Sequence, residues 1–366
     1  FVTDALYAKW AKGQAYPGCK TLTYWTGNAG TLNWGDAANW VDADGVPTAF
    51  ADNDDVVFDS RFNGTATDIT VRIADRDLAV NTVTVAADGF DLTLRSEASG
   101  MRIVENAALF KRGDGTLTLR TSGGALNLSD NRIVVEAGRI DACGSNNTEI
   151  LGAVTRRNVC AEVRDGGELW VRDRNLLGST ANGSRFGVTV CRGGTFNLRS
   201  TDNFNIQTVR AIDVERGGTF KPSDWGHSSG ILFLLERFSY DGEAPFAFEK
   251  PDGFRGGQPS IQIGTNVEFR VADVTGDDEP DFIMNGCIED YPNHNCPFRK
   301  LGPGTVLMNG EHHLTTSVSL EDGAWKGLGT HKIAADGRVS AENAGAPEST
   351  TISRGEGVWL ERGNRE

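Results

Sequence analysis

The sequence predicts an all-β protein: a single-stranded, right-handed parallel β-helix of about 10–12 coils with a short helical cap at its N-terminus. Three observations lead to this fold. Glycine-containing turns recur along the chain at a period in the twenties, alternating apolar residues flank each turn, and helical periodicity is absent between the turns. A fixed period of this length with strand chemistry in each unit is typical of a solenoid rather than of a globule.

The clearest copy of the repeat is Arg-Gly-Asp-Gly-Thr-Leu-Thr-Leu at 112–119, and segments 164–171, 192–198 and 216–221 share its shape. Alternation at period two points one set of side chains inward, and glycine permits the sharp turn between strands. Stacked units would then pair strand to strand at about 4.8 Å per coil. The turn glycines fall 23 to 29 residues apart, at positions 64, 89, 115, 138, 167, 194, 218 and 242, with Asn266 in the next place.

Length and charge restrict the partners. Solenoids grow along one axis, so 366 residues are interpreted as one long domain with attachments. The net charge of −14 repels phosphate backbones and anionic lipids, so we expect no nucleic acid partner, while cations and neutral glycans remain compatible. No run of 18 apolar residues occurs, so we expect no membrane span. The chain is expected to be a monomer.

The N-terminal segment 1–58 is predicted to cap the solenoid. Residues 5–12 have helix-forming composition, with Thr3 as a candidate N-cap and a glycine stop after them. A tryptophan-rich stretch follows, with indoles at Trp25, Trp34 and Trp40. These rings either fill the space between the helix and the first coil or form a platform on which a sugar stacks, and filling the cap is the favoured interpretation.

Two motifs resemble a known family. The Trp-rich opening with the acidic strand entry at 52–58, and the segment 109–119, resemble the autotransporter-associated β-strand repeat proteins. Segment 298–308 is a second, weaker copy of the latter motif. The resemblance covers residues 20–120 and 295–365, and it implies a secreted, passenger-type β-helix at a bacterial surface. Six cysteines beside three methionines also favour an oxidising compartment, so the expected location is extracellular or at the cell surface.

The solenoid is predicted over 59–360, with a frayed tail at 361–366. The spacing rises to 38 residues between Asn266 and Gly304, which predicts an insertion at about 272–297. Cys287 and Cys296 lie in this insertion with eight residues between them, and a local disulfide is expected; a zinc site that uses His294 is the less favoured alternative. The pairing of Cys19, Cys143, Cys160 and Cys191 is left open.

The same insertion contains the one cofactor hypothesis. Asp273, Thr275, Asp277 and Asp281 place oxygen donors at intervals around Gly276, as calcium-binding loops do. The second glycine of such loops is replaced by Asp278, so a solvated acidic loop is the alternative.

A β-helix enzyme that acts on polysaccharides needs carboxylates and a base gathered on one outer sheet. The candidates are Asp213, Asp224 and His227, with Trp225 as a sugar contact, and Asp165 could share a face with Asp213. Acidic solenoids offer such pairs readily, so the preferred function is a non-catalytic adhesion, glycan-binding or structural module. The alternative is a polysaccharide lyase or glycoside hydrolase.

Overall fold

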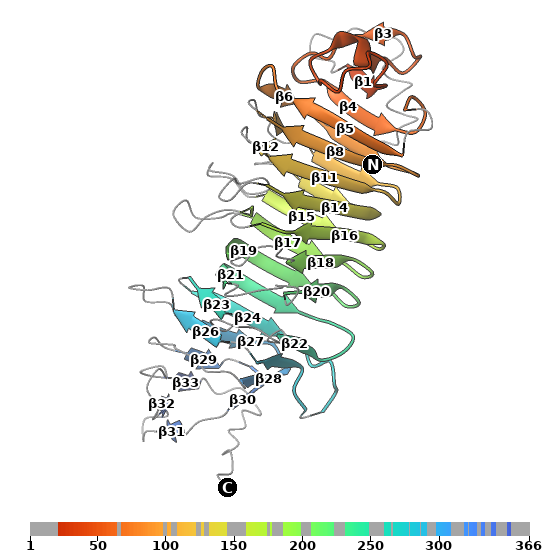
Figure 1. Ribbon diagram of the computed structural model, residues 1–366. Helices are drawn as coiled ribbons and strands as arrows, with labels where there is room; N and C mark the ends of the chain where they lie inside the picture. The colour runs from red at the N-terminus through yellow and green to blue at the C-terminus, as the bar shows by residue number, and fades with distance from the viewer. Residues whose placement is uncertain are drawn as a thin grey trace, which may run out of the picture.

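The computed structural model is an all-β solenoid of parallel strands stacked along one axis, as predicted (Figure 1). It describes residues 21–63, 67–97, 101–103, 108–121, 126–127, 132–144, 159–173, 176–177, 186–198, 206–222, 231–248, 260–264, 266–277, 279–285, 287–290, 298–308, 318–320, 322–327, 331–333, 338–341 and 350–352. The helix predicted over 5–12 lies outside these residues. Within them, the only helical turn is η1 (Ala37–Asn39).

One long ladder runs through the molecule. Each strand pairs in parallel with its counterpart in the next coil, for example Leu109 with Ile133 and Val188 with Ile212. In the part of the chain that the structure describes, the ladder from β4 to β29 has eleven strands. They are β4 (Asp55–Asp59), β7 (Val83–Ala86), β10 (Ala108–Arg112), β13 (Arg132–Val135), β15 (Val159–Val163), β17 (Phe186–Val190), β19 (Ile206–Val214), β21 (Ile231–Tyr240), β24 (Val267–Val271), β27 (Phe298–Leu301) and β29 (Val318–Leu320).

A second, seven-stranded sheet lies across the glycine turns from the first. Its inward residues, such as Leu117 and Leu169, are fully buried, while the residues between them face outward. The strands are β5 (Asp68–Ile73), β8 (Asp91–Ser96), β11 (Thr116–Thr121), β14 (Gly138–Cys143), β16 (Gly167–Val171), β18 (Thr195–Leu198) and β20 (Thr219–Lys221). The period-two alternation of the sequence therefore separates core from surface as expected.

Shorter sheets complete the coils. In the first coils, a three-stranded sheet is formed by β6 (Leu78–Val80), β9 (Met101–Ile103) and β12 (Leu126–Asn127). A four-stranded sheet serves the later ones, with β22 (Phe246–Phe248), β25 (Phe282–Met284), β28 (Thr305–Met308) and β30 (Ala324–Gly327). The strand β23 (Ser260–Ile263) pairs with β26 (Cys287–Asp290). The stretch 272–297 thus contributes β25 and β26 to parallel ladders.

The N-terminal end of the stack is closed by a buried aromatic cluster. Here β1 (Leu22–Trp25) pairs in parallel with β4 and antiparallel with β2 (Trp40–Val41), which continues to β3 (Pro47–Thr48). Trp25, Trp34 and Trp40 are each at most 2% exposed, and the indole Nε1 of Trp40 donates to the carbonyl of Trp34 at 2.8 Å. The tryptophans therefore fill the cap, and they form no exposed sugar platform.

The C-terminal end changes strand direction. The strands β31 (His331–Ile333) and β32 (Arg338–Ala341) pair antiparallel, and β32 pairs antiparallel with β33 (Thr350–Ile352). The last of these, β33, also pairs in parallel with β29. An antiparallel segment laid on the last coil covers backbone groups that would otherwise form an exposed edge.

Candidate functional site

The outer face of the long sheet carries the first catalytic candidate, Asp213, on β19. Both of its carboxylate oxygens accept hydrogen bonds from the guanidinium of Arg237 on the next strand, at 2.7 and 2.6 Å. Asp213 stands in one outward row with Thr189 and Glu162, because these residues pair across successive strands. Asp165 lies instead in the exposed turn before β16, so it does not share the row of Asp213.

The other carboxylates described on this face are paired in the same way. Glu136 forms ion pairs with two arginines, with Arg112 at 2.7 Å and with Arg164 at 2.9 Å. Arg164 also forms an ion pair with Glu162 at 2.7 Å. Further along the axis, Glu268 bonds Arg270 and Arg299. Charges on this sheet therefore alternate and neutralise one another across strands. The remaining enzyme candidates, Asp224, Trp225 and His227, lie outside the described residues.

The predicted calcium loop holds its acidic groups against its own backbone. Oδ1 of Asp273 accepts the N–H of Gly276 at 2.7 Å, and Oδ1 of Asp277 accepts the N–H of Glu279 at 2.9 Å. Among the described residues, no group of three His, Cys, Asp or Glu side chains is placed to hold a metal ion. Asp278 lies outside those residues, and calcium binding by this loop stays a prediction.

Asp281, the last residue of the calcium set, is fully buried. Its Oδ1 accepts the N–H groups of Val274 and Thr275, at 2.7 and 2.9 Å, and the hydroxyl of Thr275 at 3.0 Å. Its Oδ2 accepts the N–H of Thr305, one coil away, at 2.6 Å. Four donors therefore surround this carboxylate, three at Oδ1 and one at Oδ2. Asp281 therefore fixes the loop to the next coil.

Three cysteines in the described part of the chain are free thiols, namely Cys143, Cys160 and Cys191. Burial raises the pKa of each, to about 11 for Cys143 and Cys191. Thiols with a raised pKa are poor nucleophiles at neutral pH, which does not favour a cysteine-based chemistry. Cys287 begins β26 and Cys296 lies outside the described residues, so their disulfide stays a prediction.

Two buried lysines, which the sequence interpretation did not single out, mark the two copies of the family-like motif. Nζ of Lys111 donates to the carbonyls of Arg112 and Gly113, at 2.7 and 2.8 Å, and to that of Ala137 in the next coil at 3.2 Å. Nζ of Lys300 likewise donates to Leu301 and Gly302, at 3.1 and 2.6 Å, and to Asp322 at 3.1 Å. Each ammonium group therefore joins two coils.

Burial lowers the pKa of both lysines to about 8, against the opposing pull of nearby aspartates. A glycine of the next coil packs on each turn. A Cβ at Gly138 would lie 2.4 Å from the carbonyl oxygen of Gly113 and 2.8 Å from Nζ of Lys111, and Gly323 meets Gly302 and Lys300 in the same way. The signal in the sequence was Lys-x-Gly-x-Gly-Thr, which occurs at 111–116 and at 300–305.

The outer face of the seven-stranded sheet carries a row of like charges. Arg72 on β5 pairs with Arg95 on β8, and Arg95 pairs with Arg120 on β11. The row continues through Cys143 to Arg172, because Ala142 and Val171 are partners just before them. A parallel row of threonines lies two residues earlier in each of the first three strands, at Thr70, Thr93 and Thr118. The missed signal is the pattern apolar-Thr-apolar-Arg at 69–72, 92–95 and 117–120.

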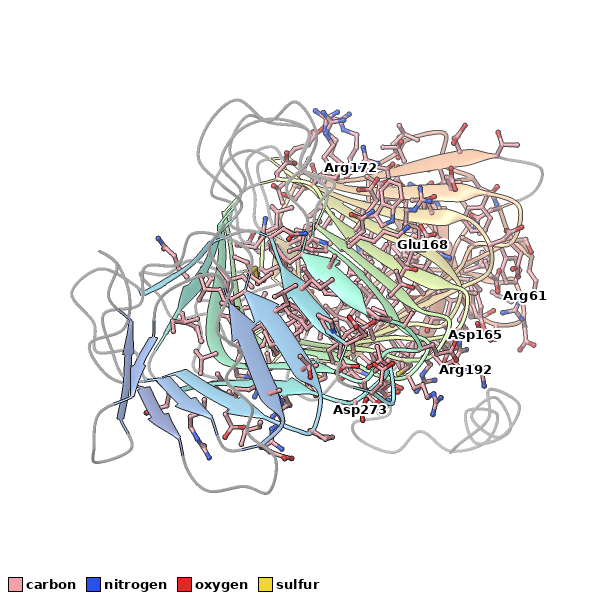
Figure 2. All side chains as sticks on the ribbon, turned by 90° about the horizontal axis from the view of Figure 1, so that it is seen from below. Arg61, Asp165, Glu168, Arg172, Arg192 and Asp273 are labelled. Carbon is pink, nitrogen blue, oxygen red and sulfur yellow. The ribbon has the colours of Figure 1, made fainter. Side chains whose placement is uncertain are left out.

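Trp170 stands next to this row on β16. The guanidinium of Arg139 lies 3.6 Å from the centroid of its ring, and Arg139 also bonds Glu168 at 2.8 Å. Arg172 pairs with Asp141. In the end-on view of Figure 2, Arg172 and Glu168 lie on the opposite side of the stack from Asp273.

Comparison with known proteins adds no relative. A scan against models of protein families, a search of curated proteins and a search of solved structures each found no match. The fold defines the class: an elongated parallel β-solenoid. Among the residues that the structure describes, no helix has the length and apolar character needed to cross a bilayer.

Proposed function

We propose that this chain is a non-catalytic module of passenger type, located outside the cell or at a bacterial surface, which binds a glycan or another surface ligand. The parallel solenoid supports this proposal because it presents long outer faces built from consecutive strands. The resemblance of segments 109–119 and 298–308 to autotransporter-associated repeats supports the location.

The observation that carries the proposal is the pairing of outward carboxylates on the long sheet. A general acid or base must be able to exchange a proton with its substrate. Both carboxylate oxygens of Asp213 instead accept hydrogen bonds from the guanidinium of Arg237. The carboxylates of Glu136, Glu162 and Glu268 also form ion pairs with arginines. The large aromatic side chains at the N-terminal end are buried, so they supply no sugar-stacking surface there.

The test is incubation with a panel of plant, algal and mucin glycans. New reducing ends report hydrolysis, absorbance from unsaturated products reports lyase activity, and retention on immobilised glycan reports binding. We expect binding without cleavage. Cleavage that Asp213→Ala or His227→Ala abolishes would establish the alternative, a carbohydrate-active enzyme on a solenoid scaffold.

A further inference from the structure

The arginine row of the seven-stranded sheet, formed by Arg72, Arg95, Arg120 and Arg172, differs from the balanced ion pairs of the long sheet. Five consecutive strands take part in the row, at about 4.8 Å per strand, so the four guanidinium groups are spread over about 19 Å along the axis. The long sheet alternates arginine with glutamate, whereas neighbouring strands here repeat the same charge.

Few carboxylates balance the row. Glu97 accepts a hydrogen bond from Nε of Arg72 at 2.9 Å and lies 3.5 Å from Arg95, and the negative charge of Asp75 also acts on Arg72. Arg172 is paired with Asp141. Within the described ranges, no carboxylate forms an ion pair with Arg120, which is exposed. The row therefore carries an excess of positive charge on a chain whose net charge is −14.

Like charges directly opposite on adjacent strands destabilise a sheet. A sequence that repeats arginine at this position in three successive coils accepts that cost, and such local conflicts with stability are typical of functional surfaces. An anion bound along the row would remove the repulsion. The excess charge thus indicates a ligand that carries several negative charges in line.

The threonine row identifies the chemistry beside those charges. Thr70, Thr93 and Thr118 are half-buried and lie two residues from the arginines on the same outer face. Hydroxyl groups donate and accept hydrogen bonds, so they match the hydroxyls of a sugar. The arginine row and the threonine row therefore lie side by side and repeat once per strand. This arrangement fits a polymer that carries acidic groups and hydroxyl groups in each repeating unit.

Resting on the binding role proposed above, we infer that this row binds a linear acidic polysaccharide, a chain of uronic acid or sulfated sugars lying along the solenoid axis. Nucleic acid fits less well. Single-stranded nucleic acids bind through stacking on exposed aromatic faces, and Trp170, beside the row, has one face covered by Arg139.

Binding is measured by calorimetry with the whole chain and four probes: polygalacturonate, heparin, neutral dextran and single-stranded DNA. The test variant is the double substitution Arg95→Gln with Arg120→Gln. The matched control is Arg270→Gln with Arg299→Gln, which removes two exposed or half-exposed arginines from the paired face of the long sheet.

We expect an acidic polysaccharide to bind with an affinity that falls as salt rises, and dextran not to bind. The test variant should lose about tenfold in affinity, which corresponds to about 1.4 kcal/mol, while the control keeps wild-type affinity. The test variant should melt no lower than the wild type, since the substitution relieves repulsion.

Three outcomes would overturn the inference: equal binding of dextran, equal loss in the two variants, or tighter binding of DNA than of either acidic polysaccharide. None of these outcomes produces cleaved glycan. The inference can therefore fail while the non-catalytic role stands, and cleavage alone would overturn that role.

Discussion

The ammonium group of Lys111 bonds carbonyls of two coils, and we call this contact the lysine clamp. Replacing Lys111 with methionine tests whether the clamp stabilises the fold. Methionine keeps most of the length of the side chain but donates no hydrogen bond, so the carbonyls of Arg112, Gly113 and Ala137 lose their shared donor. A buried carbonyl left without its donor costs about 1 kcal/mol, which already includes desolvation, so three carbonyls cost about 3 kcal/mol.

We therefore expect Lys111→Met to lower the free energy of unfolding by about 3 kcal/mol at pH 7. Urea titration followed by circular dichroism measures this change. The exposed Lys221 on β20 provides the control, and Lys221→Met should change stability by less than about 0.5 kcal/mol. Equal stability of the two variants would refute the clamp.

The dependence on pH gives a second check on the same lysine. The folded pKa of about 8 lies below the unfolded value of 10.5, so between these values the unfolded chain binds more protons. Stability contributed by the lysine therefore rises with pH through this window and is constant below it. From pH 8 to 9.5 the gap between wild type and Lys111→Met should widen by about 2 kcal/mol. A gap that narrows would mean that the buried ammonium is favoured over the neutral amine.

The remaining predictions concern glycine, acid and cysteine positions. Gly138→Ala should destabilise the fold more than Gly166→Ala by at least about 2 kcal/mol in thermal unfolding, because both have positive φ but only the former meets atoms within 3 Å. Asp281→Asn should lower the free energy of unfolding by about 2–4 kcal/mol, and Asp277→Asn should lower it much less. Similar melting temperatures of the two variants would contradict the buried role of Asp281. Calorimetry with calcium on both variants shows whether the loop binds the ion. Peptide mapping without reductant should find Cys287 in a disulfide, and a free thiol in exported protein would contradict this.

Much of the fold could be predicted because each coil of a solenoid appears in the sequence as one repeat of similar length. Each coil needs its own turn and its own inward residues, so Leu117, Leu169 and Phe196 recur in phase with the glycines. The longer spacing after Asn266 was interpreted as an insertion, but the structure places β25 and β26 there. Strands of two or three apolar residues are too short for periodicity to reveal, so a longer coil and an insertion look alike in sequence.

The candidate site was less predictable because it depends on neighbours in the next coil. Asp213 looked like a possible acid until its register placed Arg237 beside it. The sequence did not single out Lys111, since nothing local shows that carbonyls of two coils surround its amine. The arginines repeat in the sequence within the pattern apolar-Thr-apolar-Arg, but only the strand register shows that they lie directly opposite one another.

The lysine clamps also bear on how the molecule resists force. Tension along the solenoid axis pulls coil from coil, so it loads the hydrogen bonds between strands lengthwise. Lys111 and Lys300 each bond a carbonyl in their own coil and one in the next, so a side chain shares that load with the backbone. A rod held at one end and pulled at the other would therefore be expected to separate first between coils that no such lysine joins.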